Sequence, residues 1–198
     1  MKKTGKFVVV EGFDGTGKST VIGNLKKLYP GAIFVKEPGT TPFGKNMRKM
    51  LKSGRYNLDH YSEKLLFTAS MVETSLKVIK PALAKGQLVF ADRWFNSTFA
   101  YQFYGHGEPH GVMHDIYKWC GVAIPDTTII MDLPFKDCLK RQGNAGRGAK
   151  DKFESSKISY LKKVYEYYTI CPGRRVDASE PSMEIAKEIA HICAKGKR

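Results

Sequence analysis

The sequence predicts an α/β fold with a parallel sheet of five strands and helices on both of its faces. Short apolar runs alternate along the chain with longer segments of helical period, the order in which βαβ units are built. Each run is largely apolar along its length, as expected for a strand that is covered on both faces. The expected strands are Phe7–Glu11, Ala32–Val35, Leu88–Ala91, Thr127–Asp132 and Arg174–Val176.

Three segments carry clear helix signals. Thr41 can cap a helix whose first residue is Pro42, and a helix that starts near Pro181 is expected to end at Gly196. Between these two, apolar residues recur in steps of four and three from about His60 to Ile79, which predicts one buried stripe. The apolar residues expected to face the core in these helices are Phe43, Met47, Met50 and Leu51, then Leu65, Ala69, Val72, Leu76 and Ile79, then Ile185, Ile189 and Ile192.

Length and composition favour a cytoplasmic protein of one domain. A chain of 198 residues can bury its own core, and no repeat or linker divides it. No apolar run approaches the ~20 residues that cross a bilayer, and the basic start lacks a signal-peptide core. The four scattered cysteines favour reduced thiols over a zinc site. A net charge of +14 favours anionic partners, either nucleotides or nucleic acid, although a basic surface with no particular partner has the same composition.

A P-loop motif follows the first expected strand directly. Residues 12–19 fit the pattern GxxxxGK[S/T] between a strand and a helix. The backbone N–H groups of such a loop converge on the β-phosphate at a helix N-terminus, Lys18 reaches the β- and γ-phosphates, and Ser19 can ligate Mg²⁺. With the alternating strands, the motif predicts a P-loop NTPase-type sheet. The residues expected to bind ATP are Gly12, Phe13, Asp14, Gly15, Thr16, Gly17, Lys18, Ser19 and Thr20.

Two further segments suit phosphate chemistry. Asp92 and Arg93 follow the Leu88–Ala91 strand, and ligands collect at the carboxyl ends of strands in an open parallel sheet. There Asp92 can hold a water of the Mg²⁺ shell, and Arg93 can bind an acceptor phosphate. Taken alone, an Asp-Arg pair is usually a surface ion pair. From Gln142 to Lys152, glycines are interleaved with cations. This composition suits a lid over phosphates, with a solvated loop as the alternative.

Together these motifs resemble the thymidylate kinase family. They keep its order and spacing from about Phe7 to Ala178. The resemblance rests on the P-loop with aspartate at its third position, Glu37-Pro38-Gly39, Leu65-Leu66-Phe67, Asp92-Arg93, Ser97, Thr98, Ala100-Tyr101-Gln102, Pro125-Asp126, Asp132-Leu133-Pro134 and Asp151-Lys152-Phe153-Glu154. It implies a single nucleoside monophosphate kinase domain over residues 1–198, with a lid at about 142–152. It also implies transfer of the γ-phosphoryl group of ATP to dTMP, Mg²⁺ at Ser19 and Asp92, and a homodimer.

The resemblance further implies a role for each site residue. Asp14 would bind the 3′-hydroxyl of the deoxyribose, Phe67 would stack on the pyrimidine, and Tyr101 would lie near the sugar. Because Gly15 and Thr16 leave no cation inside the P-loop, the lid would supply the transition-state arginine, as in bacterial-type enzymes. The residues implied at the substrate are Asp14, Lys36, Arg48, Phe67, Met71, Arg93, Ser97, Thr98, Tyr101 and Gln102, and those implied in catalysis are Lys18, Arg93, Arg141 and Arg147, with Lys152 also in the lid.

Two positions depart from the family pattern. Lys36 stands where the family usually has arginine, which keeps the charge but loses the bidentate fork. Met71 stands where the family has an arginine that donates to the base carbonyl, and methionine cannot donate. Relaxed or altered base selectivity is therefore predicted, with dUMP or a 5-modified dUMP as the alternative substrate. A basic nucleic-acid-binding ATPase is a less favoured alternative, because no second nucleic-acid motif is present; no stable nucleic-acid partner and no membrane are expected.

Overall fold

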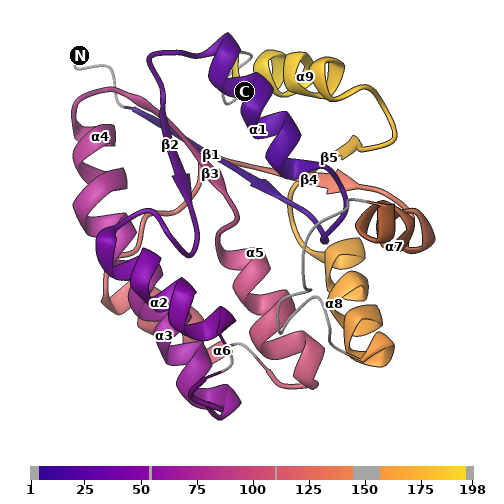
Figure 1. Ribbon diagram of the computed structural model, residues 1–198. Coiled ribbons are helices and arrows are strands. Elements are labelled where there is room, and N and C mark those ends of the chain that lie inside the picture. The colour runs from indigo at the N-terminus through magenta and orange to yellow at the C-terminus, as the bar shows by residue number, and fades with distance from the viewer. Residues whose placement is uncertain (1–4, 54, 110, 145–156, 195–198) are drawn as a thin grey trace.

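A sheet of five parallel strands forms the centre of the computed structural model, which describes residues 5–53, 55–109, 111–144 and 157–194 (Figure 1). The strand order is β2-β3-β1-β4-β5. The strands are β1 (Lys6–Glu11), β2 (Ile33–Lys36), β3 (Leu88–Asp92), β4 (Thr127–Asp132) and β5 (Arg174–Asp177). All five expected strands are confirmed, with each end within one residue of its predicted position. The predicted P-loop NTPase-type architecture is thereby confirmed.

Helices cover both faces of the sheet. Helices α1 (Lys18–Leu28) and α9 (Ser182–Ala194) pack together on one side, and α5 (Phe95–Thr98) and α8 (Ile158–Ile170) lie on the other (Figure 1). The remaining helices are α2 (Pro42–Lys52), α3 (His60–Thr74), α4 (Lys80–Ala84), α6 (Gly111–Trp119) and α7 (Phe135–Asn144), with π-helical segments at Ser75–Ile79 and Phe99–Phe103 and a 3₁₀ turn at Tyr104–His106. None of the helices in the described ranges is long and apolar enough to span a membrane. A cytoplasmic location stays a prediction.

The register of the strands brings three chain segments to one edge of the sheet. Val10 of β1 lies opposite Asp92 of β3 on one side and opposite Ile129 of β4 on the other. The loop that follows β1 and the residues that follow β3 therefore leave the sheet at the same level. Strands β1, β3 and β4 are largely apolar and buried, with Phe7, Val8 and Val10 of β1 fully inaccessible, so this edge is a rigid platform.

The start of α2 is confirmed. The Thr41 hydroxyl accepts a hydrogen bond from Gly44 N at 3.0 Å, and Pro42 is the first helical residue. Met47 and Leu51 are buried as expected, but the expectation for Phe43 is wrong, because its side chain is 45% exposed. At the other end of the chain, α9 buries Ile185 and Ile189 as predicted. Ile192 is half-buried, and Gly196 lies outside the described residues.

Most of the buried stripe predicted from His60 to Ile79 is wrong, although Ile79 is buried as predicted and Val72 is half-buried. Leu65 and Leu76 are 61% and 45% exposed, and Ala69 is also exposed, whereas the face that turns inward carries polar side chains. The physical reason is a buried carboxylate on the neighbouring turn. Glu37 accepts hydrogen bonds from the hydroxyls of Ser70, at 2.8 Å, and Thr74. Hydrogen-bonding this buried carboxyl group outweighs the burial of a few apolar side chains, since a buried polar group without partners is strongly destabilising.

Candidate active site

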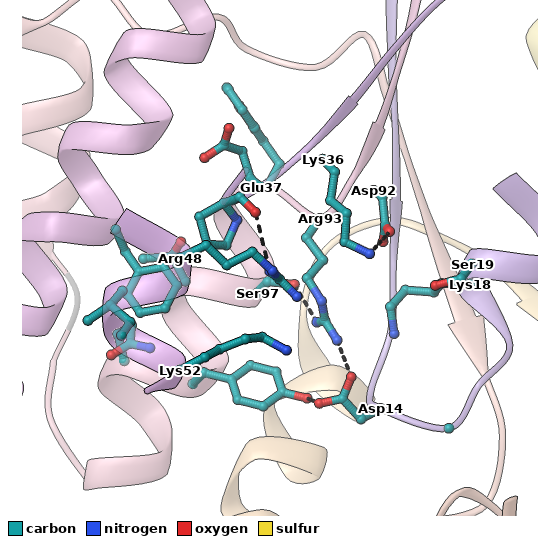
Figure 2. A pocket seen from close by; sticks show the side chains of 18 of the residues that line it. Asp14, Lys18, Ser19, Lys36, Glu37, Arg48, Lys52, Asp92, Arg93 and Ser97 are labelled. Carbon is teal, nitrogen blue, oxygen red and sulfur yellow. Dashed lines mark hydrogen bonds and ion pairs between the residues drawn. The ribbon is translucent and has the colours of Figure 1, made fainter. Parts of the chain in front are cut away.

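A cavity of about 620 Å³ lies at the carboxyl ends of β1, β2 and β3 (Figure 2). Its wall combines the loop after β1, the turn after β2, the inner faces of α2 and α3, and the residues after β3. Every residue implied at the substrate by the family resemblance lines this cavity. So do Gly15, Gly17, Lys18, Ser19, Thr20, Asp92 and Arg141, while Gly12, Phe13 and Thr16 are buried beside it. Arg147 and Lys152 lie outside the described residues.

The loop after β1 is tightly folded around Lys18. Its ammonium donates hydrogen bonds to the carbonyls of Gly12, at 2.7 Å, and Phe13, at 2.8 Å. Gly15 has φ 92°, and an added Cβ would lie 2.3 Å from the carbonyl oxygen of Cys138, so a side chain there is excluded. Burial and the guanidinium of Arg93 lower the pKa of Lys18 to about 8, against the opposing pull of nearby carboxylates. Lys18 is therefore mainly charged at neutral pH.

Asp92 and Ser19 present oxygen atoms next to this loop. Asp92 Oδ2 lies 3.0 Å from Lys36 Nζ, and the carboxylate is almost fully buried. Burial alone would raise the pKa of Asp92, but the cations of Lys36, Arg93 and Lys18 outweigh it and lower the pKa. An ionised carboxylate and a hydroxyl at the start of α1 are ligands that suit Mg²⁺, which typically takes one or two protein oxygens together with phosphates. Among the described residues, no three or more His, Cys, Asp or Glu side chains gather into a group that could hold a metal ion.

Arg93 sits at the centre of the cavity with its guanidinium held by side chains from three elements. It donates to Asp14, to the Ser97 hydroxyl at 2.9 Å and to the Tyr168 hydroxyl at 3.4 Å. Tyr101 donates to the other Asp14 oxygen at 2.6 Å, and its ring centroid lies 5.2 Å from the guanidinium carbon of Arg93. Burial opposes the charge of Arg93, but the Asp14 carboxylate raises its pKa well above the ordinary value. Arg93 is thus a permanent cation.

A mostly uncharged wall completes the cavity on the side of α3 and of the π-helical segment Phe99–Phe103. Phe67 is half-buried, and Met71 is 1% exposed. Thr98 precedes the π-helical segment, and Gln102 lies within it. π-Helical turns of this kind occur frequently at functional sites. The four side chains line the same cavity as Arg48 and Arg93, so a planar ring could lie beside them while an anion attached to it met the two guanidinium groups.

Glu37 lines the cavity, although its motif, Glu37-Pro38-Gly39, did not predict it as a site residue. Its carboxyl group is buried against Ser70 and Thr74, and burial raises its pKa to about 7, although both hydroxyls and Arg48 oppose the shift. Arg48 donates to the carbonyl of Pro38 at 3.2 Å, and the Glu37–Pro38 peptide is cis. The spacing of Ser70 and Thr74, four residues apart on one helix face, was the available signal.

Five other cavity residues were also missed, the first of them Pro38, which follows Glu37. Leu51 and Lys52 lie at the end of α2, Trp94 follows Arg93, and Gln142 lies near the end of α7. The Gln142 amide donates to the carbonyl of Asp14 at 2.7 Å, and the neighbouring Arg141 donates to the carbonyl of Ala178 at 2.9 Å. α7 therefore holds the loop after β1 through Gln142.

The sheet, the phosphate loop after β1 and the Asp-Arg pair after β3 define a P-loop kinase that acts on nucleotides. A family model described as thymidylate kinase matches residues 10–189, and the chain belongs to this family. Proteins named thymidylate kinase from Halothermothrix orenii and Burkholderia vietnamiensis are 34% and 36% identical to it, covering 94% and 96% of this chain and 95% and 98% of the relatives. A third, from Methylobacillus flagellatus, is 30% identical over 98% of both chains. The predicted family is confirmed, and the chain is an ATP-dependent phosphotransferase.

Proposed function

We propose that the protein transfers the γ-phosphoryl group of ATP to dTMP, giving dTDP, with a single kinase domain spanning residues 1–198. One observation carries this proposal: the P-loop and the mostly uncharged wall of Phe67, Met71, Thr98 and Gln102 line the same cavity. Figure 2 shows Arg93 between Arg48 on one side and Lys18 on the other. Three cations in a row suit a monophosphate that meets the end of a triphosphate.

The proposed mechanism needs no general base. The second pKa of a phosphate monoester is ~6, so the attacking oxygen is already ionised at neutral pH. Arg48 and Arg93 would hold the acceptor, Asp14 would bind the 3′-hydroxyl, and Tyr101 would crowd the 2′ position. Lys18 would stabilise the charge that spreads over the transferring oxygens, together with Arg141 and the lid residues outside the described ranges.

Ser19 and Asp92 would hold Mg²⁺ together with the phosphates of ATP. Bound there, the ion would neutralise charge on the β- and γ-phosphates. The support is the chemistry of the two groups, an ionised carboxylate and a hydroxyl that line the same cavity as Lys18. Lys36, which pairs with Asp92 at 3.0 Å, would keep that carboxylate ionised and in place.

Coupled-assay rates for a panel of monophosphates at fixed ATP and Mg²⁺ test the proposed function. dTMP should be phosphorylated, and dUMP should exceed UMP in kcat/KM because the 2′-hydroxyl would meet Tyr101. Equal kcat/KM for dUMP and UMP would contradict the role of Tyr101. Duplex DNA should not stimulate ATP hydrolysis; strong stimulation would favour the nucleic-acid-dependent ATPase instead.

Met71 supports relaxed selectivity among deoxypyrimidine monophosphates. Two polar groups that could replace a missing donor at the base are engaged elsewhere: Thr74 donates to Glu37, and Lys36 pairs with Asp92. We therefore expect the ratio of kcat/KM for dTMP over dUMP to rise about tenfold or more in Met71→Arg. Met71→Leu, which keeps the wall apolar, is the matched control. If the wild type already discriminates as sharply as Met71→Arg, another donor such as Gln102 supplies the contact.

A homodimer is also proposed, with α3 at its interface. Tyr61, Leu65 and Ala69 lie four residues apart along α3 and are exposed, and Leu76 continues the face. Such an apolar stripe suits an isologous contact with a second copy. Light scattering coupled to size exclusion should give twice the 22.3 kDa of one chain, and Leu65→Glu should give a monomer. Leu28→Glu, on exposed α1 surface, should stay dimeric; a wild type that runs as a monomer would refute the dimer.

A further inference from the structure

Glu11, the last residue of β1, is a fully buried carboxylate to which the proposed mechanism gives no role. Four donors converge on it. The backbone N–H groups of Trp94 and Ser97 donate to Oε1 at 2.6 and 3.1 Å, and the Ser97 and Tyr168 hydroxyls donate to Oε2 at 2.5 and 3.4 Å. A carboxylate that accepts several hydrogen bonds is held in one orientation.

These contacts fix the backbone on both sides of Arg93. Arg93 N donates to the carbonyl of Val10 at 3.1 Å, and the next N–H, that of Trp94, donates to Glu11. Arg93 has φ 76°, a left-handed conformation that is unfavourable for a residue with a side chain and persists only where the surroundings impose it. Helix α5 has no side-chain cap of its own at Trp94, so Glu11 caps it from β1.

The same carboxylate also holds the guanidinium of Arg93 through one intervening hydroxyl. Ser97 Oγ donates to Glu11 and accepts from Arg93 at 2.9 Å. The Tyr168 hydroxyl lies 2.9 Å from Ser97 Oγ and 3.4 Å from the Arg93 guanidinium. Glu11, Ser97 and Tyr168 are together called the relay. Ser97 is therefore placed between a buried anion and a buried cation.

We propose that Glu11 is a positioning residue that aims Arg93 at the acceptor phosphate, acting through Trp94 N, Ser97 and Tyr168; this rests on the proposed role of Arg93. The other anion that holds Arg93 is Asp14, which is itself proposed to bind the sugar. When substrate engages Asp14 and Arg93, the Glu11 relay is the contact that keeps the guanidinium in place. Pre-ordering of this kind strengthens acceptor binding and leaves ATP binding largely unchanged.

The first test compares variants of the relay by steady-state kinetics with dTMP and ATP. Glu11→Gln and Ser97→Ala should each raise the KM for dTMP about tenfold or more, the loss expected for a charge-assisted hydrogen bond, and change the KM for ATP less than about twofold. Tyr168→Phe should raise the KM for dTMP by a smaller factor. Tyr167→Phe removes a neighbouring hydroxyl that donates to Asn96 at 3.3 Å, outside the relay, and should leave both KM values unchanged.

A purely structural role for Glu11 predicts a different pattern. It would lower the thermal midpoint and the fraction of active enzyme, so that kcat falls while the KM for dTMP stays near that of the wild type. Because Glu11→Gln replaces a fully buried carboxylate, its KM values are compared only if its circular dichroism matches that of the wild type. If it does not, Ser97→Ala and Tyr168→Phe carry the test. An unchanged KM for dTMP in both of these variants overturns the inference.

An Arg93→Ala background separates this inference from the proposed function. Ser97→Ala or Glu11→Gln should raise the KM for dTMP less than about twofold there, since the group they aim is gone. If the effects instead multiply fully, the relay does not act through Arg93. If Arg93→Ala alone leaves the KM for dTMP unchanged, the proposed role of Arg93 fails first. If Arg93→Ala raises it and the relay variants do not, only the role of Glu11 fails.

Discussion

Lys18→Ala is expected to lower kcat about a thousandfold or more while the fold stays intact. The ammonium is proposed to face the β- and γ-phosphates of ATP, and in a buried site its charge is poorly screened by water. In the structure it is buried and already donates to two carbonyls of the loop, so it is held where the phosphates would arrive. The measurement is the steady-state rate of the coupled assay at saturating ATP and dTMP.

The stability of Lys18→Ala is a built-in control. Folding lowers the pKa of Lys18 to about 8, from an ordinary 10.5. The charged ammonium therefore makes the free energy of folding less favourable, fully below pH 8 and progressively less between pH 8 and 10.5. Removing the ammonium should therefore not lower the thermal midpoint at pH 7. Lys27→Ala, on the exposed last turn of the same helix, should keep full activity. If Lys18→Ala retained more than about a tenth of the wild-type rate, the P-loop assignment would fail.

The second large effect is expected for Arg147→Ala, a residue outside the described ranges. Gly15 and Thr16 leave no cation inside the P-loop, so the lid is predicted to supply the transition-state arginine. Such an arginine acts mainly in the transition state, and kcat should fall about a hundredfold or more with little change in the KM for dTMP. Single-turnover rates at saturating substrate measure this step.

Arg141→Ala is the informative comparison for the lid. The Arg141 guanidinium lines the cavity but donates to the carbonyl of Ala178, which ties it to the scaffold. We expect its removal to affect kcat less than the removal of Arg147. An unchanged kcat in Arg147→Ala, together with a large loss in Arg141→Ala or Lys152→Ala, would move the transition-state role to that residue.

Much of the site could be predicted because its motifs are attached to strand ends. In a parallel sheet the carboxyl ends of neighbouring strands lie at one edge, so the P-loop after β1 and Asp92-Arg93 after β3 had to meet once the strands were recognised. Strands β1, β3 and β4 were recognisable from short, largely apolar runs. The sugar and base residues were added by family resemblance, and all of them line the cavity.

The contacts that cross the fold could not be predicted in the same way. Glu37 meets Ser70 and Thr74 more than thirty residues away, and this pairing turns the polar face of α3 inward. Apolar periodicity weighs side-chain burial alone, so it selected the face of Leu65 and Leu76, which is exposed. Glu11 likewise meets Ser97 across 86 residues of sequence, and no local pattern links a strand-end glutamate to a serine in a later helix.

The most direct test of the central claim follows the fate of the γ-phosphorus of ATP. Phosphorus NMR of a mixture of enzyme, Mg²⁺, dTMP and ATP labelled with ¹⁸O in the γ-phosphoryl group resolves each product. The account predicts dTDP whose β-phosphorus carries the label, formed in equal amount to ADP, with little labelled inorganic phosphate. Labelled inorganic phosphate as the main product, with dTMP unchanged, would contradict it.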